Sequence, residues 1–329
     1  MLRKGTAQTR AMLHILTRGD ILAIVQTDVP MTSNLCRRTM AALAARYPAF
    51  RLETLTATAF DRPIQALRIG RGGRRVLYSA AHHANEWITA PVLLKFLEEL
   101  AAADEAQGTL FGVPTKTILN AATIFAVPMV NPDGVDLVTG AIETGVPEYE
   151  KARQFAENYP AIPFPEGWKA NLLGVDLNLQ YPAGWLKARD IKFSQGYTRP
   201  GPRDFVGRAP LNQREAIALA RYTLRVDPAL VIALHTQGKA IYWKFQEDFV
   251  AGAQELGTEF ARLSGYALED TPYNSSFAGY KDWFIKVWRR PGYTVECGSG
   301  QNPLPLSQFE EIYRAVLGIL VTGATGLPG

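Results

Sequence analysis

Three residues with the spacing and chemistry of metal ligands stand out in this chain, which has only four histidines among its 329 residues. His83 and Glu86 have the His-x-x-Glu spacing, which lets an imidazole and a carboxylate from one turn reach the same ion. His235 directly follows a short apolar run and can complete the set. Two histidines and one glutamate leave the fourth tetrahedral position of zinc open, as in catalytic sites. The residues therefore predict one Zn²⁺, which would polarise a carbonyl group and lower the pKa of a water molecule.

Polar residues follow each of four short apolar runs that we interpret as strands. The runs and the residues after them are 76–81 with His82 and His83, 124–130 with Asn131 and Asp133, 229–234 with His235, and 293–295 with Glu296. Because sites in open α/β sheets lie outside the carboxyl ends of the strands, we expect these side chains to meet. Glu296 is then a candidate general base for the water. The alternative for each residue taken alone is an ordinary hydrogen-bonded or salt-bridged side chain at the end of a strand.

Helical patterns alternate with the apolar runs. Residues 88–103 have apolar side chains at helical spacing. Capping boxes predict the starts of two more helices, at Asn212 with Glu215 and at Ser307 with Glu310. This alternation predicts an α/β fold, with a parallel or mixed sheet covered on both faces. Residues 128–210 show little periodicity and much glycine and proline, so we expect loops built over a site.

Composition excludes several classes of protein. A hydrophobic fraction of 47% and a charged fraction of 20% are those of a globular protein with an ample core. The net charge of +4 is not gathered into a basic run, so no nucleic-acid partner is expected. The two cysteines, Cys36 and Cys297, are interpreted as free thiols. No stretch is long and apolar enough for a membrane span, and charges interrupt residues 11–26, so we expect no signal peptide and a cytoplasmic location.

We expect two segments in the chain. Residues 1–28 are interpreted as an N-terminal extension and residues 29–329 as one catalytic domain. Residues 16–22 faintly resemble the start of a cell-wall-binding LysM module, but the stretch is too short to form one. The oligomeric state is left open.

Five segments resemble the zinc carboxypeptidase family in the same order. They are AHHANEW (81–87), VPMVNPDG (127–134), GVDLN (174–178), ALHTQG (233–238) and TVECG (294–298). Within this family, the chain looks closest to bacterial γ-D-glutamyl-meso-diaminopimelate peptidases. The resemblance implies a mixed, eight-stranded twisted sheet flanked by helices. It also implies hydrolysis of the γ-D-glutamyl-meso-diaminopimelate amide bond in peptidoglycan stem peptides.

The resemblance also implies roles for individual residues. The implied ligands of a single zinc ion are His83, Glu86 and His235. Glu296 would be the general base that takes a proton from the attacking water. The family places an arginine after a tryptophan to stabilise the oxyanion, and here Trp168 is followed by Lys169. A lysine can supply a point charge there but not the planar fork of arginine. A solvated loop lysine is the alternative.

The substrate-binding residues depart from the family pattern. The pair that clamps a C-terminal carboxylate is Asn178-Leu179 here instead of Asn-Arg, and Asn85 replaces another arginine. Loss of that bidentate fork would leave such a carboxylate poorly paired, as expected for a branched or γ-linked substrate. Lys281 falls where the family lines its specificity pocket, and a lysine there would favour an acidic group. Tyr273 resembles the mobile tyrosine that closes over substrate, with a packed aromatic residue as the alternative.

Other assignments stay open at this point. Arg199 and Arg203, in a proline-rich loop, are weaker candidates for binding substrate carboxylates and are alternatively loop anchors. His82 can replace His83 as a ligand in principle, but Asn85 would then stand at the matching spacing. Cys297 has no CxxC partner and is not expected to bind metal. The alternative functions are a zinc carboxypeptidase of other specificity and a catalytically silent murein-peptide binding protein.

Overall fold

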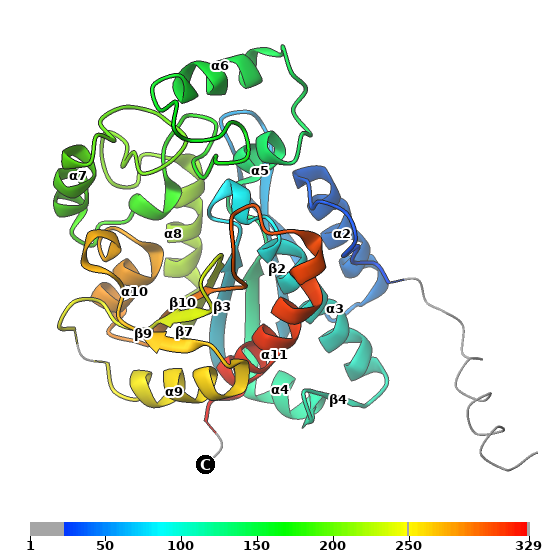
Figure 1. Cartoon of the computed structure of the whole chain (residues 1–329). Coiled ribbons are helices and arrows are strands. Elements are labelled where there is room, and N and C mark those ends of the chain that lie inside the picture. Colours follow the sequence, from blue (N-terminus) through cyan, green and yellow to red (C-terminus); the bar gives the residue numbers. More distant parts are fainter. Residues whose placement is uncertain (1–22, 249, 328–329) are drawn as a thin grey trace, which may run out of the picture.

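The chain folds around a mixed sheet of eight strands with helices on both faces (Figure 1). The computed structural model describes residues 23–248 and 250–327. The strand order across the sheet is β1-β2-β6-β3-β7-β10-β8-β9. The strand bounds are β1 (Arg51–Ala57), β2 (Pro63–Gly70), β3 (Arg74–Ala80), β6 (Ala122–Val127), β7 (Leu230–His235), β8 (Ala240–Tyr242), β9 (Ala267–Glu269) and β10 (Gly292–Glu296). The predicted α/β fold with a mixed eight-stranded sheet is therefore confirmed.

The four central strands are parallel and adjacent, in the order β6-β3-β7-β10. They are the strands that the four apolar runs predicted. Because they are parallel, their carboxyl ends meet at one edge of the sheet. The outer pairings β1–β2, β2–β6 and β10–β8 are antiparallel. β1 and β2 were not predicted because much of β1 is only half-buried, and β8 and β9 are only three residues long.

Alternate side chains of the central strands enter two separate hydrophobic cores. On β3, Tyr78 packs into one core with α3 and α11, whereas Leu77 packs into the other with α8 and α10. This alternation follows from the two-residue period of a strand, and it explains why both faces of β3 read as apolar. The larger helices are α2 (Ser33–Arg46), α3 (Thr89–Glu105), α8 (Arg214–Val226), α9 (Ala253–Ser264), α10 (Tyr280–Trp288) and α11 (Phe309–Thr325). A short helix, α4 (Thr115–Ala121), and a small hairpin of β4 (Thr109–Leu110) and β5 (Val113–Pro114) follow α3.

Both predicted capping boxes are wrong. Helix α8 begins at Arg214, and its N-terminal cap, Gln213, makes no side-chain capping bond. The oxygen Oε1 of Gln180 instead accepts from the backbone N–H groups of residues 212 and 213, at 3.0 and 3.2 Å. A distant side chain thus holds the two residues that precede α8, where the sequence predicted a local cap. Ser307 lies inside a single-turn helix, η4 (Leu306–Gln308), and α11 starts only at Phe309.

The segment 128–210 contains more helix than predicted. It forms three short helices and one 3₁₀ turn, namely α5 (Pro132–Val138), α6 (Pro147–Ala156), α7 (Trp185–Ser194) and η2 (Leu177–Leu179). These green elements gather in the upper part of Figure 1. Their helical pattern is weak because each runs for ten residues or fewer. Lys169, Asn178 and Arg203 of this segment line one cleft.

The first described residues pack on the rest of the chain, and both cysteines are buried. Val25 is buried in the larger core, so the described part before residue 29 packs on the domain. The faint LysM-like stretch 16–22 lies outside the described residues, and the boundary at residue 28 stays a prediction. Cys36 and Cys297 are buried free thiols, as predicted. None of the helices within 23–248 and 250–327 is long and apolar enough to cross a membrane.

Candidate active site

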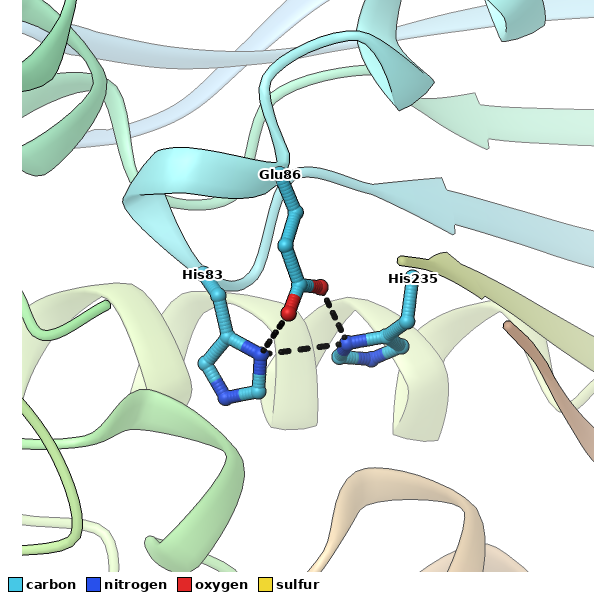
Figure 2. Close-up of side chains that lie close together, drawn as sticks. All are labelled: His83, Glu86 and His235. Atoms are coloured by element: carbon cyan, nitrogen blue, oxygen red, sulfur yellow. Dashed lines mark hydrogen bonds and ion pairs between the residues drawn. The ribbon is translucent and has the colours of Figure 1, made fainter. Parts of the chain in front are cut away.

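Two histidines and a glutamate converge at the carboxyl edge of the central strands (Figure 2). The Nδ1 atoms of His83 and His235 lie 3.3 Å apart, and each lies 2.9 Å from a different carboxylate oxygen of Glu86. Two atoms that each bind a tetrahedral zinc at about 2.0 Å are about 3.3 Å apart. The three side chains are also buried or nearly so. Donor type, spacing and burial therefore fit a zinc ion.

The fold positions these donors through two adjacent strands. β3 ends at Ala80, and the chain then turns through His83 into η1 (Ala84–Glu86), so one turn presents both the imidazole and the carboxylate. His235 is the last residue of β7, the parallel neighbour of β3. The backbone N–H of Thr236 donates to Glu86 Oε2 at 3.2 Å, which fixes the carboxylate from the β7 side.

Asp176 orients His83 from the opposite side of the ring. Its Oδ1 atom lies 3.0 Å from Nε2 of His83, which leaves Nδ1 facing the cluster. Burial alone would lower the pKa of His83, but the charges of Glu86 and Asp176 outweigh it and raise that pKa to about 9. The same negative charge favours a bound cation. Sequence reasoning assigned no role to Asp176, although it lies in the GVDLN segment that carried the family resemblance.

Glu296 stands beside the cluster as the last residue of β10. It is the register partner of His235, because β10 runs parallel to β7. Burial raises the pKa of Glu296, and the charge of His235 opposes that shift. Nothing within the described ranges donates a hydrogen bond to its carboxylate. The position and environment suit a base that faces a reacting water molecule.

Lys169 contacts the cluster from the segment 128–210. Its ammonium lies 2.9 Å from Glu86 Oε1. Burial would lower the pKa of Lys169, but the charge of Glu86 raises it above its ordinary value, so the ammonium stays protonated. The buried Trp168 precedes it and packs among α6 and the loops. The structure therefore brings Lys169 to the site, instead of leaving it as a solvated loop residue.

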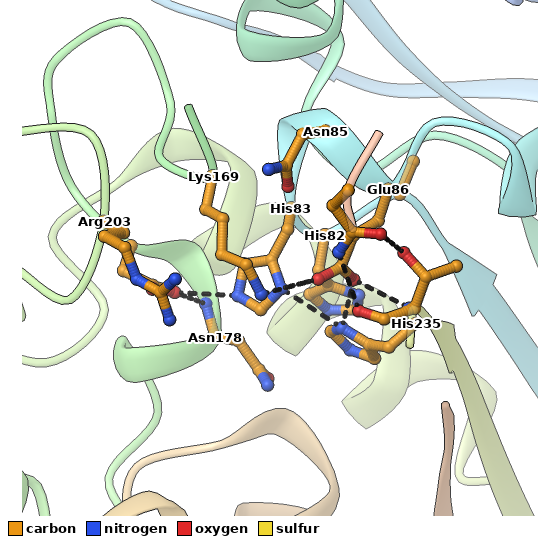
Figure 3. Close-up of polar contacts among 12 residues, drawn as sticks. His82, His83, Asn85, Glu86, Lys169, Asn178, Arg203 and His235 are labelled. Carbon is orange, nitrogen blue, oxygen red and sulfur yellow. Dashed lines mark hydrogen bonds and ion pairs between the residues drawn. The ribbon is translucent and has the colours of Figure 1, made fainter. Parts of the chain in front are cut away.

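A cleft of about 200 Å³ opens in front of these residues. Its lining includes His83, Lys169, Asn178, Arg203, Lys281 and Glu296. Asn178 uses its Oδ1 to accept from the backbone N–H of Tyr280 at 3.0 Å, which leaves its two amide hydrogens for other partners. In Figure 3, Arg203 lies to the left of His83, and the side chain of Asn178 runs below His83.

Two of the predicted substrate-binding residues, Asn85 and Tyr273, lie outside the cleft lining. Asn85 is buried and donates to the backbone oxygen of Glu166 at 3.1 Å, and it does not line the cleft. Tyr273 is 57% exposed and packs edge-on against Phe277, also outside the lining. Lys281 does line the cleft, but its ammonium already contacts three acceptors.

His82 does not join the donor cluster. It is fully buried and stacks on His235, with ring centroids 5.3 Å apart, and it also packs against Tyr181 and Tyr280. Burial lowers its pKa well below the ordinary value, so the ring is neutral. This packing role supports the choice of His83 as the ligand. Cys297 is buried in the larger core and is not part of the cluster.

Known proteins resemble this chain along most of its length. The zinc carboxypeptidase family model matches residues 36–317. Gamma-D-glutamyl-L-diamino acid endopeptidase 1 of Lysinibacillus sphaericus is 44% identical over 283 residues, which cover 85% of this chain and 69% of that protein. The uncharacterized protein YqgT of Bacillus subtilis is 38% identical over 276 residues, covering 83% and 72% of the two chains.

Solved structures share the fold at low sequence identity. Thrombin activatable fibrinolysis inhibitor superposes with a TM-score of 0.71 at 16% identity, covering 96% of this chain and 80% of the other. Murein-tripeptide amidase MpaA of Escherichia coli O157 superposes with a TM-score of 0.53 at 19% identity, covering 84% and 93%. With the family model across most of its length and two relatives more than 30% identical, the chain belongs to the zinc carboxypeptidase family and is a hydrolase of that class.

Proposed function

We propose that this protein hydrolyses the amide bond between γ-D-glutamate and a diamino acid, meso-diaminopimelate, in peptidoglycan stem peptides. The substrate assignment is supported by the name of the Lysinibacillus sphaericus relative, a γ-D-glutamyl-L-diamino acid endopeptidase. The observation that carries the reaction type is the juxtaposition of the His83, Glu86 and His235 donors with the carboxylate of Glu296. Peptidases that use one zinc ion need this combination of ligand set and base.

His83, Glu86 and His235 would hold a single zinc ion through two Nδ1 atoms and a carboxylate. When bound there, zinc acts as a Lewis acid toward a carbonyl group and lowers the pKa of water. Asp176 holds the ring of His83 in the orientation that presents Nδ1. Such an acceptor behind a metal-binding histidine fixes its tautomer and increases its affinity for the metal.

Glu296 would serve as the proton carrier of the reaction. Its carboxylate accepts a proton from the attacking water and returns it to the nitrogen of the leaving diamino acid. A base of this kind works best when its pKa lies between those of its two partners, and burial moves the pKa of Glu296 upward in that direction. Lys169 would place positive charge near the oxyanion that forms on the scissile carbonyl. The point charge of a lysine suits this role without requiring a planar fork.

The departures from an ordinary carboxypeptidase support a γ-linked substrate. Leu179 lines the cleft where the family pattern has an arginine, so the Asn-Arg clamp for a C-terminal carboxylate is incomplete. Asn178 keeps its free amide hydrogens and is our proposed substrate contact. We propose that the Lys281 ammonium binds an acidic group of the substrate. To do so, it would release one of its present acceptors. Tyr273 and Asn85 would need to move from the positions they occupy here.

The direct test is mass spectrometry of L-Ala-γ-D-Glu-meso-diaminopimelate after incubation with the protein. We expect L-Ala-D-Glu and free diaminopimelate, with cleavage abolished by a chelator and restored by zinc. A conventional peptide with a free C-terminus is the parallel substrate. Cleavage of that peptide alone would replace the proposal with a carboxypeptidase of other specificity. Binding of the murein peptide without cleavage by the zinc-loaded protein would indicate a silent binding protein.

A further inference from the structure

The positively charged side chains that line the cleft differ in how many of their N–H donors already contact an acceptor. They are Lys169, Lys192, Arg203 and Lys281. The Lys281 ammonium donates to Lys244 O and Thr271 Oγ1, at 2.6 and 3.3 Å, and forms an ion pair with Asp282 Oδ1 at 2.7 Å. Lys192 is buried and lies 2.6 Å from Asp204 Oδ1. Lys169 is paired with Glu86 in the metal cluster.

Arg203 is the exception among these four. Its Nε donates to Asp204 Oδ2 at 2.6 Å, whereas no residue within the described ranges accepts from its two terminal nitrogens. Its side chain is 41% exposed, so those nitrogens are open to the cleft. Two parallel N–H groups at the tip of a guanidinium match the two oxygens of a carboxylate. Arg203 thus offers the bidentate fork that position 179 has lost.

The backbone around Arg203 is held on both sides, so the fork is preorganised. Pro202 O accepts from the backbone N–H groups of Lys169 and residue 170, at 2.7 and 2.8 Å. Phe205 O accepts from the backbone N–H of Asp176 at 2.9 Å. These bonds join the loop around Arg203 to the segments that carry Lys169 and Asp176. Each of those residues contacts one of the three predicted zinc ligands. A fork fixed in this way loses little conformational entropy when it binds an anion.

Asp204 adds a further constraint on the same loop. One of its oxygens binds Arg203 and the other binds Lys192, so the carboxylate is shared between two cations. Its backbone N–H donates to Asp176 Oδ2 at 3.2 Å. Because Asp204 is engaged by both neighbours, it neutralises only part of their charge, and the cleft wall at Arg203 stays positive.

We propose that Arg203, together with the free amide of Asn178, is a specificity-determining site that binds a substrate carboxylate in place of the arginine missing at Leu179. The proposal rests on the proposed function, because a γ-linked glutamyl substrate brings carboxylates that ordinary peptides lack. One source is the α-carboxylate of the glutamyl residue, which the γ-linkage leaves free. The other source is the diamino acid on the leaving side.

The test compares three related peptide substrates, each with the wild-type protein and with variants at Arg203 and Arg199. The substrates are L-Ala-γ-D-Glu-meso-diaminopimelate, the same peptide amidated at the glutamyl α-carboxylate, and the same peptide amidated at the diaminopimelate carboxylates. The proteins are wild type, Arg203→Gln, Arg203→Lys and Arg199→Gln. Arg199 is the matched control because it lies in the same loop, is exposed and does not line the cleft.

For the acidic peptide, Arg203→Gln is expected to lower kcat/KM by about 10- to 100-fold, mainly through KM, as for a lost charged hydrogen-bond pair. Arg203→Lys is expected to keep part of the wild-type kcat/KM. Arg199→Gln should have the same kcat/KM as wild type. One of the two amidated peptides reacts equally with wild type and with Arg203→Gln, and that peptide identifies the carboxylate. Equal losses on all three peptides would assign Arg203 a structural role only, and either that result or unchanged kinetics overturns the proposal.

Failure of the proposed function gives a different result. In that case, wild type cleaves none of the three γ-linked peptides. The same four proteins are then compared on a conventional peptide with a free or an amidated C-terminus. If Arg203→Gln lowers kcat/KM only for the peptide with a free C-terminus, that result still supports carboxylate binding by Arg203. If it lowers kcat/KM equally for the free and the amidated peptide, the proposal is overturned.

Discussion

Glu296 and His235 are direct register partners at the ends of the parallel strands β10 and β7, so a carboxylate and an imidazole stand side by side at the edge of the sheet. The backbone hydrogen bonds of the sheet fix this relationship. The side chains therefore need no contact with each other to stay at the site, and Glu296 keeps its carboxylate free for a proton.

Replacing Glu296 by glutamine should abolish turnover while zinc stays bound. The amide keeps the shape of the side chain but cannot accept a proton, and general-base catalysis contributes about 10²- to 10⁴-fold. Peptide cleavage is measured alongside zinc content by mass spectrometry. Glu269→Gln, at an exposed residue of the same sheet, is the control and should retain activity. Near-normal turnover of Glu296→Gln would contradict the assignment of Glu296 as the general base.

Substitution of His235 by alanine should remove the metal and with it the activity. The site would keep only two of its three donors, and zinc needs at least three protein ligands in catalytic sites. His82→Phe is the comparison, because a phenyl ring can keep the stack on His235 but cannot bind zinc. Metal analysis should find about one zinc per chain for His82→Phe. Loss of zinc in that variant would assign the ligand role to His82.

Asp176→Asn should weaken zinc binding without removing any ligand. The asparagine cannot act as the charged acceptor for Nε2 of His83, and comparable changes behind metal-binding histidines cost about 10- to 100-fold in affinity. Competition with a chelator measures the affinity directly. Because excess zinc should restore most of the activity, a loss of turnover that no zinc concentration rescues would contradict this role.

Glu215 should make the protein less stable as pH rises. The side chain is buried, and burial raises its pKa from 4.5 to about 7, although Asn171 donates to it at 3.1 Å. The folded state therefore holds a proton that the unfolded state releases between these two pH values. Stability is full below about pH 4.5 and is lost as pH rises through about 7, by up to about 3 kcal/mol in total.

Glu215→Gln tests this dependence, because the amide cannot ionise. The variant should gain stability relative to wild type at pH 8 but not at pH 4.5, measured by urea unfolding at one zinc concentration. Glu143→Gln, at an exposed glutamate, is the control and should follow wild type. An equal difference between Glu215→Gln and wild type at both pH values would show that Glu215 does not titrate in this range.

Local patterns were sufficient where neighbours in the chain are also neighbours in space. The His-x-x-Glu spacing places His83 and Glu86 on one turn regardless of the rest of the fold. The apolar runs predicted the four central strands because those strands are buried on both faces, which leaves an unbroken apolar signal. Polar residues at their carboxyl ends then predicted His235 and Glu296 as partners in one site.

Contacts between segments far apart in the chain could not be predicted from local patterns. Gln180 accepts from the backbone N–H groups of residues 212 and 213, just before α8, and no local capping bond marks the start of this helix. Asp176 reaches His83, 93 residues away in sequence, and Arg203 is aimed into the cleft by backbone bonds to two other segments. Local sequence patterns were enough to predict the ligand types and the strands that carry them. The tertiary structure decided which side chains support those ligands and which cation keeps its donors free, because both depend on partners that sequence spacing does not encode.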